Sequence, residues 1–138
     1  MSKLYVLDAC ALIAALENED GAEKVAAVYS EAASGGANII INVINLLEVY
    51  YDYYRMKGKE SAEKMAAEII ASSTDVISII SRDVFAEAGR LKANYKISLA
   101  DSIVLAQAKV MNATLLTSDH HEMDKIEANE PINFLWIR

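Results

Sequence analysis

The stretch Leu4-Tyr5-Val6-Leu7-Asp8 decides the fold, together with the helical pattern from Ala9 to Leu16 that follows it. Leu4 to Leu7 is short and apolar, which predicts a strand, and the direct passage into a helix predicts a β–α unit. The remaining chain alternates in the same way. We expect further strands over 39–41, 76–80, 114–117 and 133–137, and further helices over 21–33, 43–57, 60–72, 83–95, 98–111 and 120–126.

The expected strands indicate an α/β fold. Ile39-Ile40-Ile41 is a continuous β-branched run, which is typical of a strand buried on both faces. Strands of this kind separated by helices predict a parallel sheet with helices on each face. Five such strands with right-handed crossovers form a three-layer α/β/α sandwich. The length of 138 residues fits one domain, which we expect to span residues 1–138.

Composition restricts the class of protein further. The chain is 54% hydrophobic and 24% charged, and its apolar stretches fall short of the roughly 20 residues that a membrane-spanning helix needs. The first eight residues lack the apolar region of a signal peptide. Cys10 is the single cysteine, which excludes an intrachain disulfide and a cysteine-based zinc site. We therefore expect a cytoplasmic protein that does not enter a membrane.

The formal net charge of −7 is unusual for a protein that binds nucleic acid. Acids that hold metal ions contribute to this sum, however, and the bound cations would themselves attract phosphate. Basic residues also cluster locally, within residues 55–59 and at Arg90, Lys92 and Lys96.

Three aspartates stand at element boundaries. Asp8 and Asp119 each follow an expected strand, and Asp101 lies three residues after Ser98 at the start of a helix. Each has a structural interpretation, because Asp is a good N-cap and Ser-x-x-Asp resembles a capping box. Glu122 would be the reciprocal partner of Asp119. The cap and ligand interpretations are compatible, since one carboxylate has several acceptor sites.

Glu48 has no such capping explanation. It shares a helix face with Asn45 and Asp52, so a solvated face is its structural alternative. Ligands in open α/β sheets bind outside the carboxyl ends of the strands, and we expect Glu48 and Asp101 in the first turns of helices that start there. The four acids would then converge and repel one another without a cation. Hard oxygen ligands favour Mg²⁺ or Mn²⁺, and the matching chemistry is phosphodiester hydrolysis.

Four segments give the chain a resemblance to the PIN-domain family, and particularly to its VapC-type toxins. They are Val6 to Ile13, Asn45 to Val49, Ser98 to Ala106 and Leu115 to Asp119. The resemblance implies the strand order 3-2-1-4-5, dependence on Mg²⁺ or Mn²⁺, and cleavage of single-stranded RNA. It also implies a homodimer and a cognate antitoxin protein. By position, the catalytic and metal-ligand roles fall on Asp8, Glu48, Asp101 and Asp119.

Some residues depart from the family pattern or extend it. Cys10 stands where many relatives have Ser or Thr, and a thiol donates hydrogen bonds only weakly. His120 and His121 occupy a variable stretch, so we interpret both as flanking residues rather than as ligands of metal or phosphate. Asp124 is a candidate outer acid of the site, with an unrelated surface position as its alternative.

The tyrosine-rich segment Tyr50-Tyr51-Asp52-Tyr53-Tyr54 has two interpretations, base stacking and packing. Helical spacing favours packing in the core and at a subunit interface. The family resemblance implies that the helix pair from Val43 to Ser72 receives the antitoxin peptide. Arg55, Lys57 and Lys59 are candidate RNA contacts, with a solvated turn as the alternative.

Rival functions fit the sequence less well. A phosphatase with an aspartyl nucleophile needs a second Asp two residues after the first, and that position is Cys10. A dinucleotide-binding protein would show G-x-G-x-x-G after the first strand, and this chain does not. A catalytically inactive module that binds RNA or protein is disfavoured by the complete acid set. A PIN-type RNA-processing nuclease without an antitoxin remains the alternative to a toxin.

Overall fold

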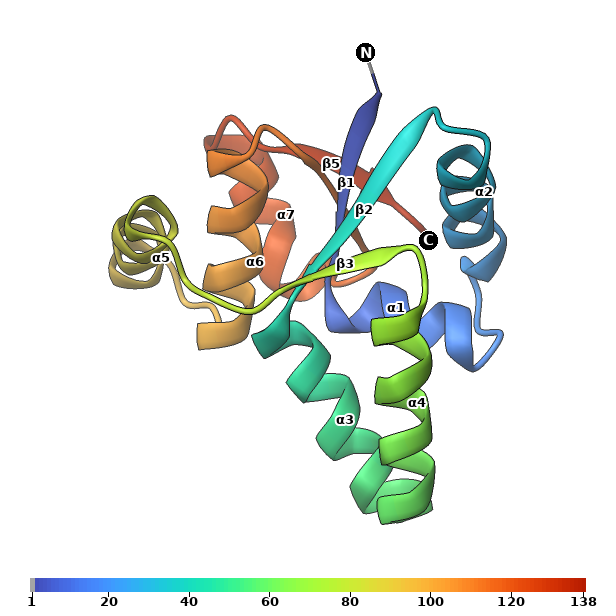
Figure 1. The fold of residues 1–138 in the computed structure, drawn as a ribbon. Helices are drawn as coiled ribbons and strands as arrows, with labels where there is room; N and C mark the ends of the chain where they lie inside the picture. The colour runs from blue at the N-terminus through green and yellow to red at the C-terminus, as the bar shows by residue number, and fades with distance from the viewer. Residues whose placement is uncertain (1) are drawn as a thin grey trace.

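The structure, a computed structural model, describes residues 2–138 and contains a five-stranded parallel sheet in the order β3-β2-β1-β4-β5 (Figure 1). The strands are β1 (Lys3–Leu7), β2 (Ala37–Asn42), β3 (Thr74–Ile77), β4 (Thr114–Thr117) and β5 (Asn133–Trp136). The helices are α1 (Ala9–Leu16), α2 (Ala22–Ala33), α3 (Val43–Lys57), α4 (Lys59–Ala71), α5 (Arg82–Asn94), α6 (Leu99–Val110) and α7 (His120–Asn129). The predicted fold class and strand order are confirmed.

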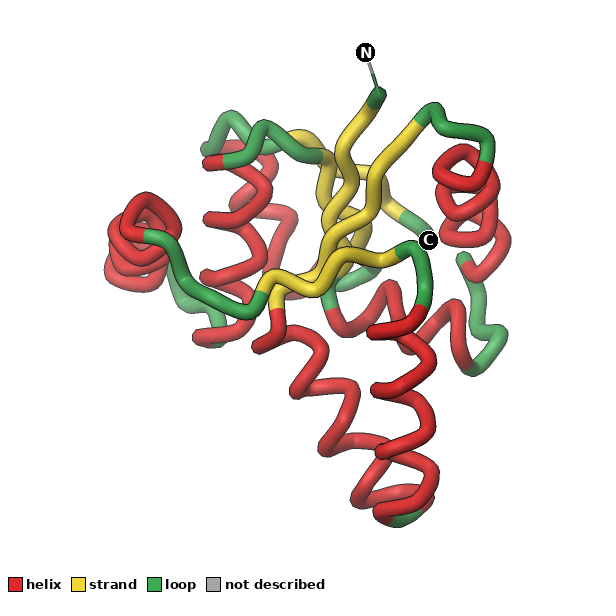
Figure 2. The backbone as a smooth tube through the Cα atoms, in the orientation of Figure 1, coloured by secondary structure: helices red, strands yellow, loops and turns green. Residues whose placement is uncertain are grey.

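Helices cover both faces of the sheet (Figure 2), and a hydrophobic core lies on each face. Successive side chains of a strand point to opposite faces. Accordingly, Tyr5 and Leu7 belong to the core beneath α1–α4, while Val6 belongs to the core beneath α5–α7. Ile40 likewise faces away from its neighbours Ile39 and Ile41. This arrangement explains why the strand sequences are apolar without alternation.

Local sequence signals set the helix boundaries. Ser81 and Ser98 accept hydrogen bonds from the first-turn N–H groups of α5 and α6, as N-caps do. Gly58, with φ of 92°, lies between α3 and α4 in a conformation that favours glycine. The α3–α4 hairpin extends away from the sheet (Figure 1). Within residues 2–138, no helix has the length and apolarity to cross a bilayer.

Two elements end three residues away from the expected position. The third strand runs over Thr74–Ile77 rather than 76–80, because it pairs with β2 and that partner ends at Asn42. Ile79 and Ile80 therefore lie in the connection to α5 and are 74% and 38% exposed. The last helix extends to Asn129 rather than to residue 126, which adds three exposed residues to it.

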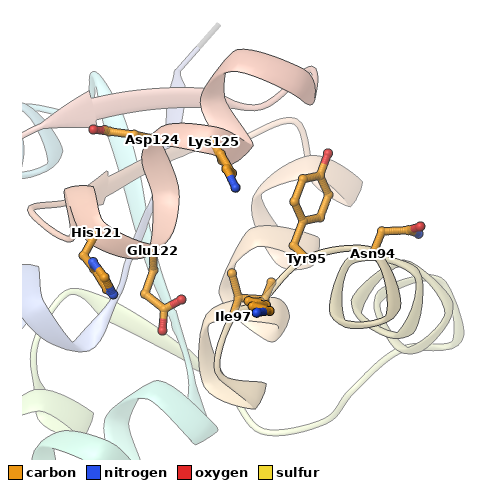
Figure 3. Close-up of a pocket in the computed structure, with 8 residues that line it drawn as sticks. Asn94, Tyr95, Ile97, His121, Glu122, Asp124 and Lys125 are labelled. Atoms are coloured by element: carbon orange, nitrogen blue, oxygen red, sulfur yellow. The ribbon is translucent and has the colours of Figure 1, made fainter.

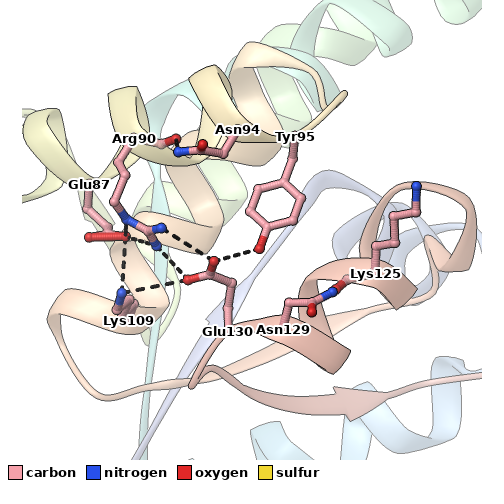
Figure 4. A network of polar contacts seen from close by, with 8 residues as sticks. All are labelled: Glu87, Arg90, Asn94, Tyr95, Lys109, Lys125, Asn129 and Glu130. Carbon is pink, nitrogen blue, oxygen red and sulfur yellow. Dashed lines mark hydrogen bonds and ion pairs between the residues drawn. The ribbon is translucent and has the colours of Figure 1, made fainter.

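A charged network fixes α5 and α6 against the end of α7 (Figure 4). Arg90 forms ion pairs with Glu87 and Glu130, and Lys109 approaches the same two carboxylates at 3.1 and 3.8 Å. Tyr95 donates a 2.7 Å hydrogen bond to Glu130. The Glu130 side chain is only 8% exposed, so water has little access to its negative charge. Arg90 and Lys109 compensate that charge instead. The network therefore holds α5, α6 and the end of α7 against one another.

Candidate functional site

Asp8 lies at the carboxyl end of β1 and is 2% exposed. Its Oδ1 accepts a 2.8 Å hydrogen bond from the N–H of Ala11, so it is the N-cap of α1. Its Oδ2 accepts a hydrogen bond from the hydroxyl of Thr117 at the end of β4. Both carboxylate oxygens are therefore held in place, which gives Asp8 a single orientation at the edge of the sheet.

Asp119 follows β4 and caps α7. Its Oδ1 accepts a 3.2 Å hydrogen bond from the N–H of Glu122, and its own N–H donates at 3.1 Å to the hydroxyl of Thr117. Thr117, not the side chain of Glu122, thus satisfies the Asp119 N–H, and the expected capping box is only half formed. Thr117 connects Asp8 and Asp119, a role that was not predicted from the sequence.

Asp101 is in the first turn of α6, where its N–H donates to Ser98 Oγ at 3.1 Å. Glu48 lies in the second turn of α3 rather than in the first turn as expected. One turn before Glu48, the buried amide of Asn45 donates at 3.3 Å to the carbonyl of Ala100. Asn45 is therefore not on a solvated face. It fastens α3 to the start of α6 and so brings Glu48 toward Asp101.

All four expected acids line one cavity of about 250 Å³, here called the carboxylate cavity. Two further acids, Asp52 and Glu122, and the half-buried Cys10 also line it. Glu122 was expected only as a capping partner. The Asn45 Oδ1 has no hydrogen-bond partner within residues 2–138, although it is buried.

Burial and mutual repulsion change the ionisation of these acids. Burial raises the pKa of Asp8 to about 7, and the charges of Asp119 and Glu48 contribute in the same direction. Burial likewise raises the pKa of Asp101 to about 7, with the charges of Asp119 and Asp8 adding to the effect. The pKa of Glu48 is raised by burial and by the charge of Asp52.

Cys10 responds to the same negative field. Burial, followed by the charge of Asp8 and then of the other site acids, raises the pKa of its thiol to about 12. The thiol therefore stays neutral at physiological pH and is a poor nucleophile.

The donor set has the chemistry of a site for a hard cation, because four carboxylates converge, no histidine of the described chain lines the cavity, and the Cys10 thiol keeps its proton. The side chains are not closed around a common point, however. Within residues 2–138, no three His, Cys, Asp or Glu side chains already stand in an arrangement that would hold a metal ion. Asp8 is held by two hydrogen bonds, so closure would depend on the less buried Glu48, Asp101 and Asp119.

The other candidate residues lie outside this cavity. Asp124 does not reach it and instead contacts His120 Nδ1 at 2.8 Å. His120 also bonds the carbonyl of Arg138 and stacks on Trp136 with ring centroids 3.9 Å apart, which makes it a structural residue. His121 lines a separate, neighbouring cavity. The interpretation of Asp124 as an outer acid of the site was therefore wrong.

The fold and this cavity define an α/β protein with a carboxylate site at the carboxyl edge of a parallel sheet. The model of the PIN-domain family matches residues 5–129, and the chain belongs to that family. No curated protein matches the sequence.

Solved structures share the fold at low sequence identity. A chain of DNA-bound VapBC from Salmonella typhimurium is 16% identical, with TM-score 0.77 and complete coverage of both chains. A chain of VapBC2 from Rickettsia felis, bound to a promoter DNA fragment, is 21% identical, with TM-score 0.71 and coverage of 96% of this chain and 98% of the other. VapC20 from Mycobacterium tuberculosis, a sarcin-ricin loop cleaving toxin, is 16% identical, with TM-score 0.62 and coverage of 80% and 86%.

Proposed function

We propose that the chain is a metal-dependent endoribonuclease that hydrolyses phosphodiester bonds in single-stranded RNA and acts as the toxin of a toxin–antitoxin pair. The observation that carries the proposal is the convergence of Asp8, Glu48, Asp101 and Asp119 on one cavity. We assign the nuclease domain to the whole of residues 1–138. Membership of the PIN-domain family supports the reaction class.

The ionisation of the cavity supports a cation requirement. Buried acids with a raised pKa hold unfavourable charge near neutral pH, and a divalent cation would remove that penalty by compensating it. Oxygen-only ligands favour Mg²⁺ or Mn²⁺. Asp8, Glu48, Asp101 and Asp119 would hold the cation, which when bound supplies charge compensation and an activated water for hydrolysis.

The remaining residues position these acids. The Thr117 hydroxyl donates a hydrogen bond to Asp8 and accepts one from the backbone N–H of Asp119, so it positions both acids. Asn45 fixes α3 against α6 and so sets the separation of Glu48 and Asp101. Asp52 and Glu122 also line the cavity, with Asp52 paired to Arg55. Preorganised groups of this kind do not have to reorient when charge develops in the reaction.

Partner binding would use the α3–α4 hairpin. Large apolar side chains are exposed there, among them Leu47, Tyr51 and Met56 at 51%, 46% and 78%. A second cavity of about 220 Å³ runs beside α3 and shares Ile13 and Asp52 with the carboxylate cavity. An antitoxin segment bound in it would approach the acids directly. The VapBC complexes among the similar structures support an antitoxin partner.

We also propose a homodimer, formed through the exposed face of α3 that the antitoxin segment would not cover.

The basic segment at the end of α3 is less available for RNA than its sequence suggests. Arg55 pairs with Asp52, and Lys57 pairs with Glu17 at 2.7 Å. These contacts favour the solvated-turn interpretation for both residues.

Cleavage of RNA by purified protein tests the reaction. We expect cleavage with Mn²⁺ or Mg²⁺ and none with a chelator. Glu48→Gln should reduce the rate by about 10²-fold or more, as the loss of a preorganised charge does. Glu68→Gln removes the same charge from an exposed position on α4 and should leave the rate unchanged. Equal cleavage in chelator, or full activity of Glu48→Gln, would contradict the proposed site.

The toxin role needs a separate experiment in cells. Induced expression should arrest growth, and co-expression with the product of a small adjacent gene should restore it. Expression of Glu48→Gln should be harmless. Growth arrest that persists in the inactive variant would contradict a nuclease toxin.

A further inference from the structure

A larger cavity adjoins the carboxylate cavity, between the start of α7 and the segment that connects α5 to α6 (Figure 3). Its volume is about 500 Å³, within the range of pockets that hold small ligands. Glu122 lines both cavities, so the two adjoin at this residue. We call it the flanking cavity, and the residues that matter are Asn94, Tyr95, Lys96, His121, Glu122 and Lys125.

Tyr95 gives the flanking cavity a fixed aromatic wall. Its hydroxyl donates at 2.7 Å to Glu130, which is itself held by Arg90 (Figure 4). The ring is therefore fixed at its polar end, while part of its surface stays accessible at the cavity. A fixed, partly exposed ring is the platform on which single-stranded bases stack.

Two lysines give the flanking cavity cationic groups. Lys96 and Lys125 are exposed and line it, and neither forms an ion pair with any residue between 2 and 138. This distinguishes them from Lys109, whose charge is compensated by Glu87 and Glu130. Lys125 extends toward Tyr95 in Figure 3, whereas Asp124 points away from both.

The acids of the flanking cavity leave these lysines available. Asp124 is engaged by His120, and Glu122 lies on the side shared with the carboxylate cavity. The flanking cavity therefore offers an aromatic ring and two ammonium groups, while its acid Glu122 is shared with the carboxylate cavity.

We infer that the flanking cavity is a nucleotide subsite, which binds one base and the adjacent phosphate of an RNA strand beside the bond that is cut. Tyr95 stacks on the base, and Lys96 and Lys125 bind the phosphate. This inference rests on the proposed ribonuclease function and adds to it the residues that hold the strand. The subsite acts in binding and not in the chemical step, so its removal should change KM and leave kcat intact.

The test compares two double variants with the same change in charge. Lys96→Ala/Lys125→Ala removes both cations of the flanking cavity. Lys24→Ala/Lys64→Ala removes two exposed lysines, from α2 and α4, that line neither cavity, and serves as the control. Binding of a fluorescein-labelled single-stranded RNA is followed by anisotropy in chelator over a range of salt concentrations. Cleavage of the same RNA is measured with Mn²⁺.

We expect the flanking-cavity pair to raise Kd and KM about 10-fold, with kcat unchanged, and to lower the salt slope by about 0.7 for each phosphate that is no longer neutralised. Tyr95→Leu should raise Kd by roughly 5-fold or more, while Tyr95→Phe, which keeps the ring, should bind nearly as wild type. The control pair should change Kd much less than the flanking-cavity pair.

Equal effects of the two double variants would overturn the subsite, because they would reflect net charge alone. Unchanged Kd and KM in the flanking-cavity pair, with an active wild type, would also overturn it and leave the nuclease proposal intact. A wild type that binds RNA but never cleaves it would refute the nuclease proposal instead. Melting temperatures of all variants separate weaker binding from impaired folding.

Discussion

Replacement of Asp8 by Asn separates the capping role of this residue from its charge. Asn ranks beside Asp as an N-cap, so its side-chain oxygen can still accept from the N–H of Ala11. The amide NH₂ can donate to Thr117 Oγ1, which reverses the direction of the hydrogen bond in the wild type. The variant therefore preserves the local contacts and removes one negative charge from the carboxylate cavity.

The magnitude follows from the raised pKa. Burial raises the pKa of Asp8 from 3.8 to about 7, a difference of about three pH units that corresponds to about 4 kcal/mol at 1.36 kcal/mol per unit. Because the folded-state pKa is the higher one, ionisation destabilises the fold. The stability from protonated Asp8 is complete below about 3.8 and is lost as the pH rises through about 7.

The Asp8→Asn variant avoids this destabilisation but changes the hydrogen bond with Thr117. That hydroxyl already accepts from the N–H of Asp119 and would lose the acceptor for its own proton, at a cost of about 1–2 kcal/mol. The net expectation at pH 8 in chelator is a gain of roughly 2 kcal/mol, which for a domain of this size raises Tm by roughly 5–10 °C. At pH 4 the gain should disappear.

Thermal melts followed by circular dichroism measure this at both pH values, with and without Mn²⁺. The wild type should gain about 2.7 kcal/mol at a Mn²⁺ concentration of 100 times Kd, and Asp8→Asn should gain less and should not cleave RNA. Asp75→Asn removes one exposed charge from β3 and controls for net charge. A lower Tm of Asp8→Asn in chelator would refute the electrostatic argument, and an unchanged Mn²⁺ response would remove Asp8 from the ligand set.

Three further substitutions test the elements around the site. Thr117→Val removes the hydroxyl that donates to Asp8 and should lower the free energy of unfolding by about 1–3 kcal/mol, measured by urea unfolding. It should also strongly reduce cleavage in the RNA assay. Glu130→Gln should lower the free energy of unfolding by about 2 kcal/mol at pH 7. Because Arg90 lowers the pKa of Glu130, this difference in stability from wild type should vanish as the pH falls below 4.5. An equal difference at acidic pH would contradict the argument. Leu47→Glu should shift a homodimer toward monomer in light scattering at micromolar concentration, whereas a wild type that is already monomeric would contradict the proposed association.

Much of the fold was predictable because its signals are local. The Asp8 cap defines the start of α1, Gly58 ends α3, and the helices over Ala9–Leu16 and Val43–Lys57 were predicted with the bounds that form. The β3 strand was misplaced because Ile79 and Ile80 resemble strand residues, while the position of the strand is set by pairing with β2. Apolar character alone does not distinguish a strand from an exposed surface patch.

The site was predictable only in part. The positions of the four acids follow from the rule that parallel strands present their carboxyl ends at one edge. The bond from Thr117 to Asp8 joins residues 109 positions apart, and the burial of Asn45 depends on the approach of α6 to α3. Neither residue carries a sequence signal, since both depend on how distant elements pack. The separation of Asp124 from the cavity depends likewise on the direction of α7.

The formal charge of −7 counts every acid as ionised, and the structure shows why this total is a poor guide to RNA binding. Asp8 and Asp101 titrate near neutral pH, so part of the negative charge is absent until a cation binds and compensates it. Glu130 and its neighbours neutralise Arg90 within the protein. Lys96 and Lys125 remain beside the carboxylate cavity. An RNA strand therefore meets these cations locally, and its affinity should rise when Mn²⁺ is added, because the ion compensates negative charge in the adjoining cavity and itself attracts phosphate.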